Sequence, residues 1–163
     1  MRASQALSGE RDYYEYADAA VRAQQVGEAK AVLDEGLSRG MVETARVPRE
    51  LSAATAARAL AAERGRLAGL RTAALAPAGT GQQARGAGDL HFGNGLYTEA
   101  AELYRAALTK GGEDANLVNS RLGAALALAG RRAEAEAALR LVAGPRAELA
   151  GFWLAWLSRR PVV

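Results

Sequence analysis

The feature that most constrains this chain is a pattern of small and large residues that recurs after 35 positions in its C-terminal half. The first copy comprises Gly88, His91, Gly95, Ala100, Tyr104 and Ala107, and the second comprises Gly123, Leu126, Gly130, Ala135, Leu139 and Val142. Small residues correspond to small ones, and large residues mostly to large ones. A fixed interval of this kind indicates tandem structural units that pack on one another.

Each copy predicts a pair of antiparallel helices. The first helices are expected over about 83–93 and 117–129. The leading glycine of each copy leaves room for a neighbouring helix, and the large residue of the second helix fills the space between layers. Gly95 and Gly130 mark the turns, where a positive φ costs glycine little. We therefore expect two consecutive helical hairpins.

Composition supports helices and excludes several other classes. Half of the 163 residues are hydrophobic, only 6% are aromatic and only 4 are proline, which favours packed helices over an all-β fold. The chain has no cysteine, which removes disulfides and thiolate metal sites. The formal charge of +3 divides into an acidic excess over 10–43 and a basic excess over 44–80, and the basic stretch has no aromatic residue. We therefore expect no nucleic-acid partner.

The segments GNGLYTEAAELYRAALTKGG and LGAALALAGRRAEAEAALRLV resemble tetratricopeptide repeats, whose period is about 34 residues. This resemblance implies an all-α fold, an α-α superhelix (a solenoid) of antiparallel helix pairs. The order of segments from EAKAVLDEGLSRG to GPRAELAGFWLAWL is similar to the C-terminal part of larger proteobacterial tetratricopeptide proteins. Those proteins often begin with an export signal, so the resemblance implies a terminal fragment or a shortened relative. The expected compartment is the periplasm for a fragment of an exported precursor and otherwise the cytoplasm.

The repeat frame also predicts the organisation of the rest of the chain. Residues 1–45 contain a divergent helix pair over about 10–43, whose turn glycine, Gly27, is displaced from the position of Gln24 that the frame predicts. Residues 46–80 form a long linking helix from Pro48, which Gly65 and Gly69 could split into two, and a Gly-rich linker. The remaining segments are two repeat units, 81–115 and 116–149, and a capping helix, 150–163. All are expected to form one solenoid.

The resemblance implies a protein-binding scaffold whose first helices line a groove for a peptide or protein segment. Mapped onto this chain, the groove positions are Tyr14, Asp18 and Val21 in the divergent unit, Arg85, Asp89 and Phe92 in the next, and Leu117, Arg121 and Leu128 in the last. The family's carboxylate-clamp variant has an asparagine where this chain has Asp89, whose charge would repel a terminal carboxylate. We therefore expect mixed polar and apolar contacts.

The aromatic residues of the C-terminal segment allow a second interpretation. Phe152, Trp153 and Trp156 either belong to a helix that covers the end of the array, or remain partly exposed and form a dimer or partner contact. Self-association as a homodimer is therefore the alternative to the scaffold function.

The sequence offers little material for catalysis. It has one histidine, His91, at an expected core position, and no metal-ligand or nucleophile motif. The glycines of GTGQQARGAG follow no strand and end in no Gly-Lys-Ser/Thr sequence, so we interpret them as a linker. We expect no enzyme activity, no cofactor, no metal and no membrane insertion, since no apolar run is long enough to span a bilayer.

Overall fold

The computed structural model describes residue 7, residues 9–43 and residues 53–159. Within these ranges all regular structure is helical. The chain divides into two compact units, Met1–Ala68 (unit 1) and Gly69–Val163 (unit 2). The expected start of the linking helix at Pro48 and the last four residues of the expected capping segment lie outside the described residues. The all-α prediction is confirmed for the described part of the chain.

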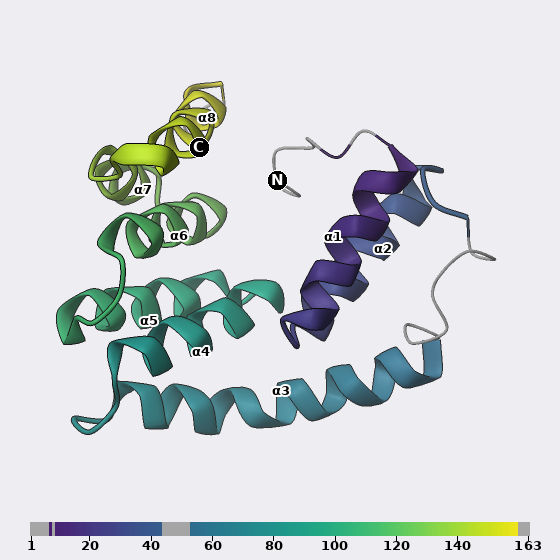
Figure 1. Cartoon of the computed structure of the whole chain (residues 1–163), viewed down its shortest axis with the longest axis horizontal. Coiled ribbons are helices and arrows are strands. Elements are labelled where there is room, and N and C mark those ends of the chain that lie inside the picture. The colour runs from purple at the N-terminus through teal and green to yellow at the C-terminus, as the bar shows by residue number, and fades with distance from the viewer. Residues whose placement is uncertain (1–6, 8, 44–52, 160–163) are drawn as a thin grey trace. The chain divides into compact units, whose positions relative to one another are not determined.

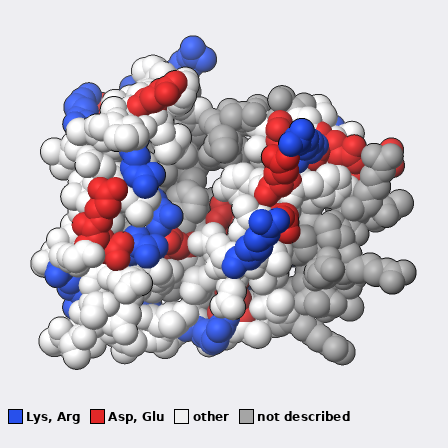
Figure 2. Space-filling model, viewed as in Figure 1, with Lys and Arg blue, Asp and Glu red and all other residues white. Residues whose placement is uncertain are grey.

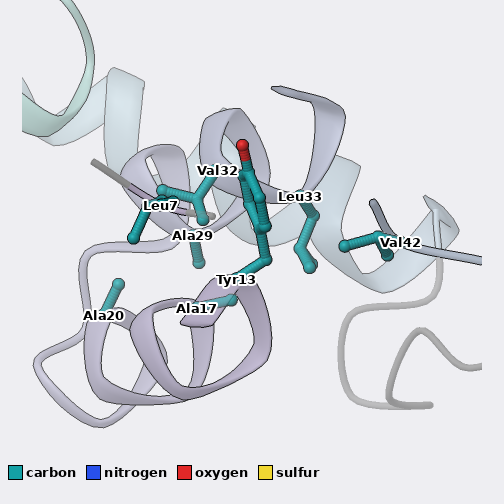
Figure 3. Close-up of a cluster of buried hydrophobic side chains, with 8 residues drawn as sticks. All are labelled: Leu7, Tyr13, Ala17, Ala20, Ala29, Val32, Leu33 and Val42. Atoms are coloured by element: carbon teal, nitrogen blue, oxygen red, sulfur yellow. The ribbon is translucent and has the colours of Figure 1, made fainter. Parts of the chain in front are cut away.

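Unit 1 contains a helical hairpin of α1 (Glu10–Arg22) and α2 (Val26–Ser38). Its core is a cluster of small and medium side chains around Tyr13 (Figure 3). The ring of Tyr13 lies so close to Gly36 of α2 that a Cβ atom added there would be 2.9 Å from Cδ1. The Tyr13 hydroxyl accepts a hydrogen bond from Arg39 Nη1 at 2.9 Å. The glycine therefore allows the two helices to approach around a buried aromatic ring.

The long helix α3 (Ala53–Leu75) is continuous through Gly65 and Gly69. The structure thus resolves the alternative that the sequence leaves open, because these glycines do not split the helix. Nothing lies within 4 Å of a Cβ atom added at either position. Along this helix, Leu67 and Ala74 are buried, Leu60 is half-buried and Leu70 is exposed.

A buried carboxylate on α3 caps α2. Glu63 is only 1% exposed, and its Oε2 accepts a hydrogen bond from the backbone N–H of Val26, the first residue of α2, at 2.9 Å. The N-cap residue Gln25 makes no side-chain cap bond. Glu63 therefore supplies the side-chain cap that the N-cap residue of α2 does not, and its negative charge at the helix N-terminus is stabilising.

Unit 2 holds two further hairpins (Figure 1). The helices are α4 (Gly81–Gly93), α5 (Tyr97–Lys110), α6 (Ala115–Leu128), α7 (Arg132–Arg140) and, after a 3-10 turn at Gly144–Arg146, α8 (Ala147–Ser158). Helix α5 packs on both α4 and α6, α6 packs on α7, and α8 packs on α6 and α7. Each element in this series therefore contacts its neighbours along the chain.

The start of α4 corrects one prediction. The glycines of GTGQQARGAG belong mostly to this helix and not to a linker. Thr80 accepts a hydrogen bond from the N–H of Gln83 at 3.2 Å, and the Gln83 side chain accepts one from the N–H of Thr80 at 2.9 Å. This capping box satisfies two N–H groups and begins the helix two residues before the expected position.

The three hairpins share one turn. In each, a residue with positive φ follows the first helix: Gln24 (58°), Gly95 (79°) and Gly130 (78°). The N–H of the next residue then bonds the carbonyl oxygen five positions earlier, as Gln25 to Ala20 (2.8 Å), Leu96 to His91 (2.9 Å) and Arg131 to Leu126 (2.8 Å). In the divergent hairpin the turn thus lies at Gln24, where the repeat frame places it, while Gly27 is buried inside α2.

Residues one interval apart also share their packing. A Cβ atom added at Gly88 would lie 2.7 Å from Cε1 of Tyr104, and one added at Gly123 would lie 2.4 Å from Cγ of Leu139. Ala100 and Ala135 on the second helices are fully buried. The small and large positions therefore meet in the same way in both hairpins of unit 2.

Candidate functional site

The first helices of the two hairpins in unit 2, α4 and α6, carry six of the predicted groove residues. On α4, Arg85, Asp89 and Phe92 follow one another at intervals of four and three residues, which places them along one face of the helix. On α6, Leu117, Arg121 and Leu128 are also partly accessible. We call these six residues the α4–α6 face.

Asp89 is the centre of a hydrogen-bonded cluster that joins the two hairpins. Its Oδ2 accepts hydrogen bonds from Arg85 Nη1 at 3.0 Å and from Arg121 Nη1 at 2.6 Å. Its Oδ1 accepts a hydrogen bond from the hydroxyl of Tyr104, on α5, at 2.9 Å. Arg85 also donates from Nε to Glu113, in the segment between α5 and α6. The structure therefore brings together Arg85, Asp89 and Arg121, three residues predicted for the site.

Burial and pairing act on Asp89 in opposite directions. The Asp89 side chain is only 11% exposed, and its burial raises the pKa of the carboxyl group. The charge of Arg121, the hydroxyl of Tyr104 and the charge of Arg85 lower this pKa without cancelling the effect of burial. Two arginines face two carboxylates, so the cluster has no net charge when both acids are ionised.

The two arginines differ in what they can still bind. Arg85 contacts two carboxylates, those of Asp89 and Glu113, and is mostly covered. The side chain of Arg121 is 36% exposed and makes one hydrogen bond to the described residues, although a guanidinium group has five N–H donors. Arg121 can therefore donate further hydrogen bonds to a group outside the molecule.

Besides Arg121, the α4–α6 face carries apolar side chains. Phe92 is half-buried and packs edge-on against Tyr97, with ring centroids 5.3 Å apart. Leu117 and Leu128 are half-buried on α6. A surface of this kind can contact an apolar side chain and hydrogen-bond to a main chain.

The other three predicted groove residues lie in unit 1, on α1. Tyr14 is half-buried, and its hydroxyl donates to the carbonyl oxygen of Glu43 at 3.3 Å. Asp18 is exposed and pairs with Arg22. Val21 packs at the edge of the unit 1 core. The α4–α6 face is therefore built from unit 2 alone.

The structure separates the three aromatic residues that the sequence grouped on the C-terminal segment. Trp153 is buried, so it is a packing residue and not a surface contact. Trp156 is half-buried and packs edge-on against Trp153, with centroids 5.4 Å apart. Phe152 is 64% exposed. Of the three, only Phe152 is fully available to another molecule.

Two members of the Asp89 cluster were not predicted. Tyr104 was expected only as an apolar filler, although a buried tyrosine usually needs a partner for its hydroxyl. Glu113 follows the end of a helix and belongs to no periodic pattern in the sequence. His91, by contrast, is buried as expected, with Nδ1 2.8 Å from the carbonyl oxygen of Ala87.

Charges of both signs are mixed on the face of the molecule that Figure 2 shows, and they do not gather into a patch of one sign. Among the described residues, no group of three or more His, Asp or Glu side chains could hold a metal ion. None of the described helices combines the length and the apolar character that crossing a bilayer requires.

No family model matches the chain, and no curated protein or solved structure is significantly similar to it.

Proposed function

We propose that this chain is a non-enzymatic scaffold of the tetratricopeptide type, which binds a segment of another protein on the α4–α6 face. The observation that carries the proposal is the equivalent packing of the two hairpins of unit 2. Gly88 with Tyr104 and Gly123 with Leu139 form the same contact one interval apart. Tandem helical hairpins of this kind expose a row of first helices, a surface that suits an extended polypeptide.

The chemistry of the α4–α6 face supports a partner of mixed character. Arg121 offers hydrogen-bond donors, while Phe92, Leu117 and Leu128 offer apolar area. Arg85 and Arg121 already donate hydrogen bonds to Asp89. Fewer donors are therefore left for a terminal carboxylate, which disfavours a partner that binds through one. We therefore propose an internal peptide segment as the ligand, held by an apolar side chain and by main-chain carbonyl groups on Arg121.

A peptide selection against the whole chain tests this function. Peptides from a random library are selected on the immobilised protein, and their Kd is then measured by fluorescence anisotropy for the wild type and for variants. We expect Leu128→Asp and Arg121→Gln each to weaken binding by about tenfold, since each removes a direct contact.

The matched control is Arg105→Gln. Arg105 forms a 2.6 Å ion pair with Glu134 that joins α5 to α7, the second helices of the hairpins. It has the same length as the Arg121–Asp89 pair but lies on the second helices. Binding should be unchanged in this variant. Selected peptides that bind all three variants as tightly as the wild type would exclude the α4–α6 face.

The proposed compartment follows from the resemblance to exported proteobacterial proteins. Binding is proposed to occur in the periplasm if the chain derives from an exported precursor, and in the cytoplasm otherwise. Fractionation of cells that produce the protein from its own gene, followed by immunoblotting, distinguishes the two compartments.

A further inference from the structure

Helix α8 has two opposite faces of different composition. Its inner face, Ala150, Trp153 and Leu157, is buried where the helix packs on α6 and α7. Its outer face follows the spacing i, i+4, i+7 and i+11 and consists of Glu148, Phe152, Ala155 and Arg159. All four are exposed. We call these four residues the outer stripe.

The outer stripe is unusual for a surface of this protein. Phe152, at its centre, is more exposed than any other described aromatic side chain, and Leu149 beside it is also exposed. The only charged residues in 147–159 are Glu148 and Arg159, one at each end of the helix. Neither forms an ion pair with a described residue. Aromatic side chains are enriched in protein–protein contacts, so the exposed ring of Phe152 makes the outer stripe a candidate contact surface.

The outer stripe is complementary to itself. If a second α8 lies antiparallel to the first, a two-fold axis between residues 153 and 154 places Glu148 opposite Arg159 of the other copy. The same axis places Phe152 opposite Ala155, so that a large side chain meets a small one. The ion pair and the apolar contact then each occur twice, as a two-fold symmetric interface requires.

We propose that α8 docks antiparallel against α8 of a second copy of this chain through the outer stripe. Charge complementarity favours this occupant, because an antiparallel second copy of α8 presents an opposite charge at each end of the outer stripe. The proposal is independent of partner binding on the α4–α6 face and concerns a different surface of unit 2.

Sedimentation velocity of the whole chain over a range of concentrations tests the proposal. The wild type should show a monomer–dimer equilibrium. Phe152→Ala should weaken the dimer by at least about tenfold, since each dimer loses two buried rings. Leu141→Ala is the matched control, because Leu141 is 67% exposed but lies outside the stripe. It should dimerise as the wild type does.

Charge reversal tests the antiparallel register. Glu148→Arg alone and Arg159→Glu alone should each weaken the dimer by about fivefold to tenfold, because like charges then face each other at both ends. The double variant should restore wild-type association. Circular dichroism checks that each variant retains its helices.

A monomer at every concentration overturns the proposal and leaves the stripe to a different polypeptide. A dimer that survives Phe152→Ala, or one that the double reversal does not restore, overturns it as well.

Discussion

Tyr104 packs directly on Gly88, with its Cε1 atom 2.7 Å from the place that a Cβ atom at Gly88 would occupy. The same ring donates its hydroxyl hydrogen bond to Asp89, the next residue. One side chain on α5 therefore fixes the distance to α4 through its ring and joins the polar cluster through its oxygen. Gly123 and Leu139 repeat the first of these contacts but not the second.

Gly88→Ala should destabilise unit 2 by about 1–3 kcal/mol, because the new methyl group and the Tyr104 ring cannot occupy the same space. Gly86→Ala in the same helix is the matched control, since nothing lies within 4 Å of a Cβ atom there. It should stabilise the protein by about 0.5–1 kcal/mol through helix propensity. Urea unfolding followed by circular dichroism measures both. Equal effects of the two substitutions would contradict the close contact.

Gln24→Gly should stabilise unit 1 by about 0.5–1 kcal/mol, because Gln24 has a φ of 58° that costs glycine much less. Gln82→Gly, an exposed position inside α4, should instead lower stability by a similar amount. Thermal unfolding of both variants checks the opposite signs. A loss of stability in Gln24→Gly would show that the turn does not require this conformation.

Thr80→Ala should destabilise α4 by about 1 kcal/mol, because the N–H of Gln83 loses its acceptor. Thr98→Ala tests the same change of side chain where Thr98 forms no cap, in the first turn of α5. It should have no measurable cost. Hydrogen exchange of the first amides of α4 is the sharper readout, and protection there should fall only in Thr80→Ala.

The pH dependence of stability should differ between the wild type and Asp89→Asn. Burial raises the pKa of Asp89, so the folded state holds this proton more tightly than the unfolded chain does. The contribution of Asp89 to stability is then fully present below the ordinary carboxyl pKa of about 4, and it is lost as the pH rises through the higher folded value. The wild type should therefore lose stability relative to Asp89→Asn as the pH rises through this window.

Glu136→Gln provides the comparison of opposite sign. The hydrogen bond from Arg132 is the main cause that lowers the pKa of Glu136. The wild type should therefore gain stability relative to Glu136→Gln as the pH rises through the acidic range. Urea titrations from about pH 3 to 7 measure the difference in unfolding free energy between the wild type and each variant. If both differences changed in the same direction with pH, the opposite pKa shifts of Asp89 and Glu136 would be contradicted.

The small and turn positions of the hairpins could be predicted because they depend on local geometry. Gly95 and Gly130 have the positive φ expected of them, and the frame placed the third turn at Gln24 even though that residue is not a glycine. Gly27 misled because a glycine can also serve as a small buried residue inside a helix, which is its role in α2.

The polar contacts between helices could be predicted only in part. The resemblance to tetratricopeptide repeats implied the positions of Arg85, Asp89 and Arg121 on the first helices. Their mutual pairing depends on how two helices approach, which no periodicity encodes. Glu63 was missed for the same reason, since its partner Val26 lies on a different helix. In α8, neighbouring residues lie about 100° apart around the helix axis, so Trp153 is buried while Phe152 is exposed.

The Asp89 cluster occurs at one joint of unit 2 and has no counterpart at the equivalent positions of the following hairpin, where Ala124 and Leu139 replace Asp89 and Tyr104. The two hairpins are thus not interchangeable modules. A chain in which their order was exchanged would keep each glycine beside its large neighbour, yet the acid would no longer face the arginine of the hairpin that follows it. The contact between Asp89 and Arg121 therefore requires this order of the two hairpins, and not only their shape.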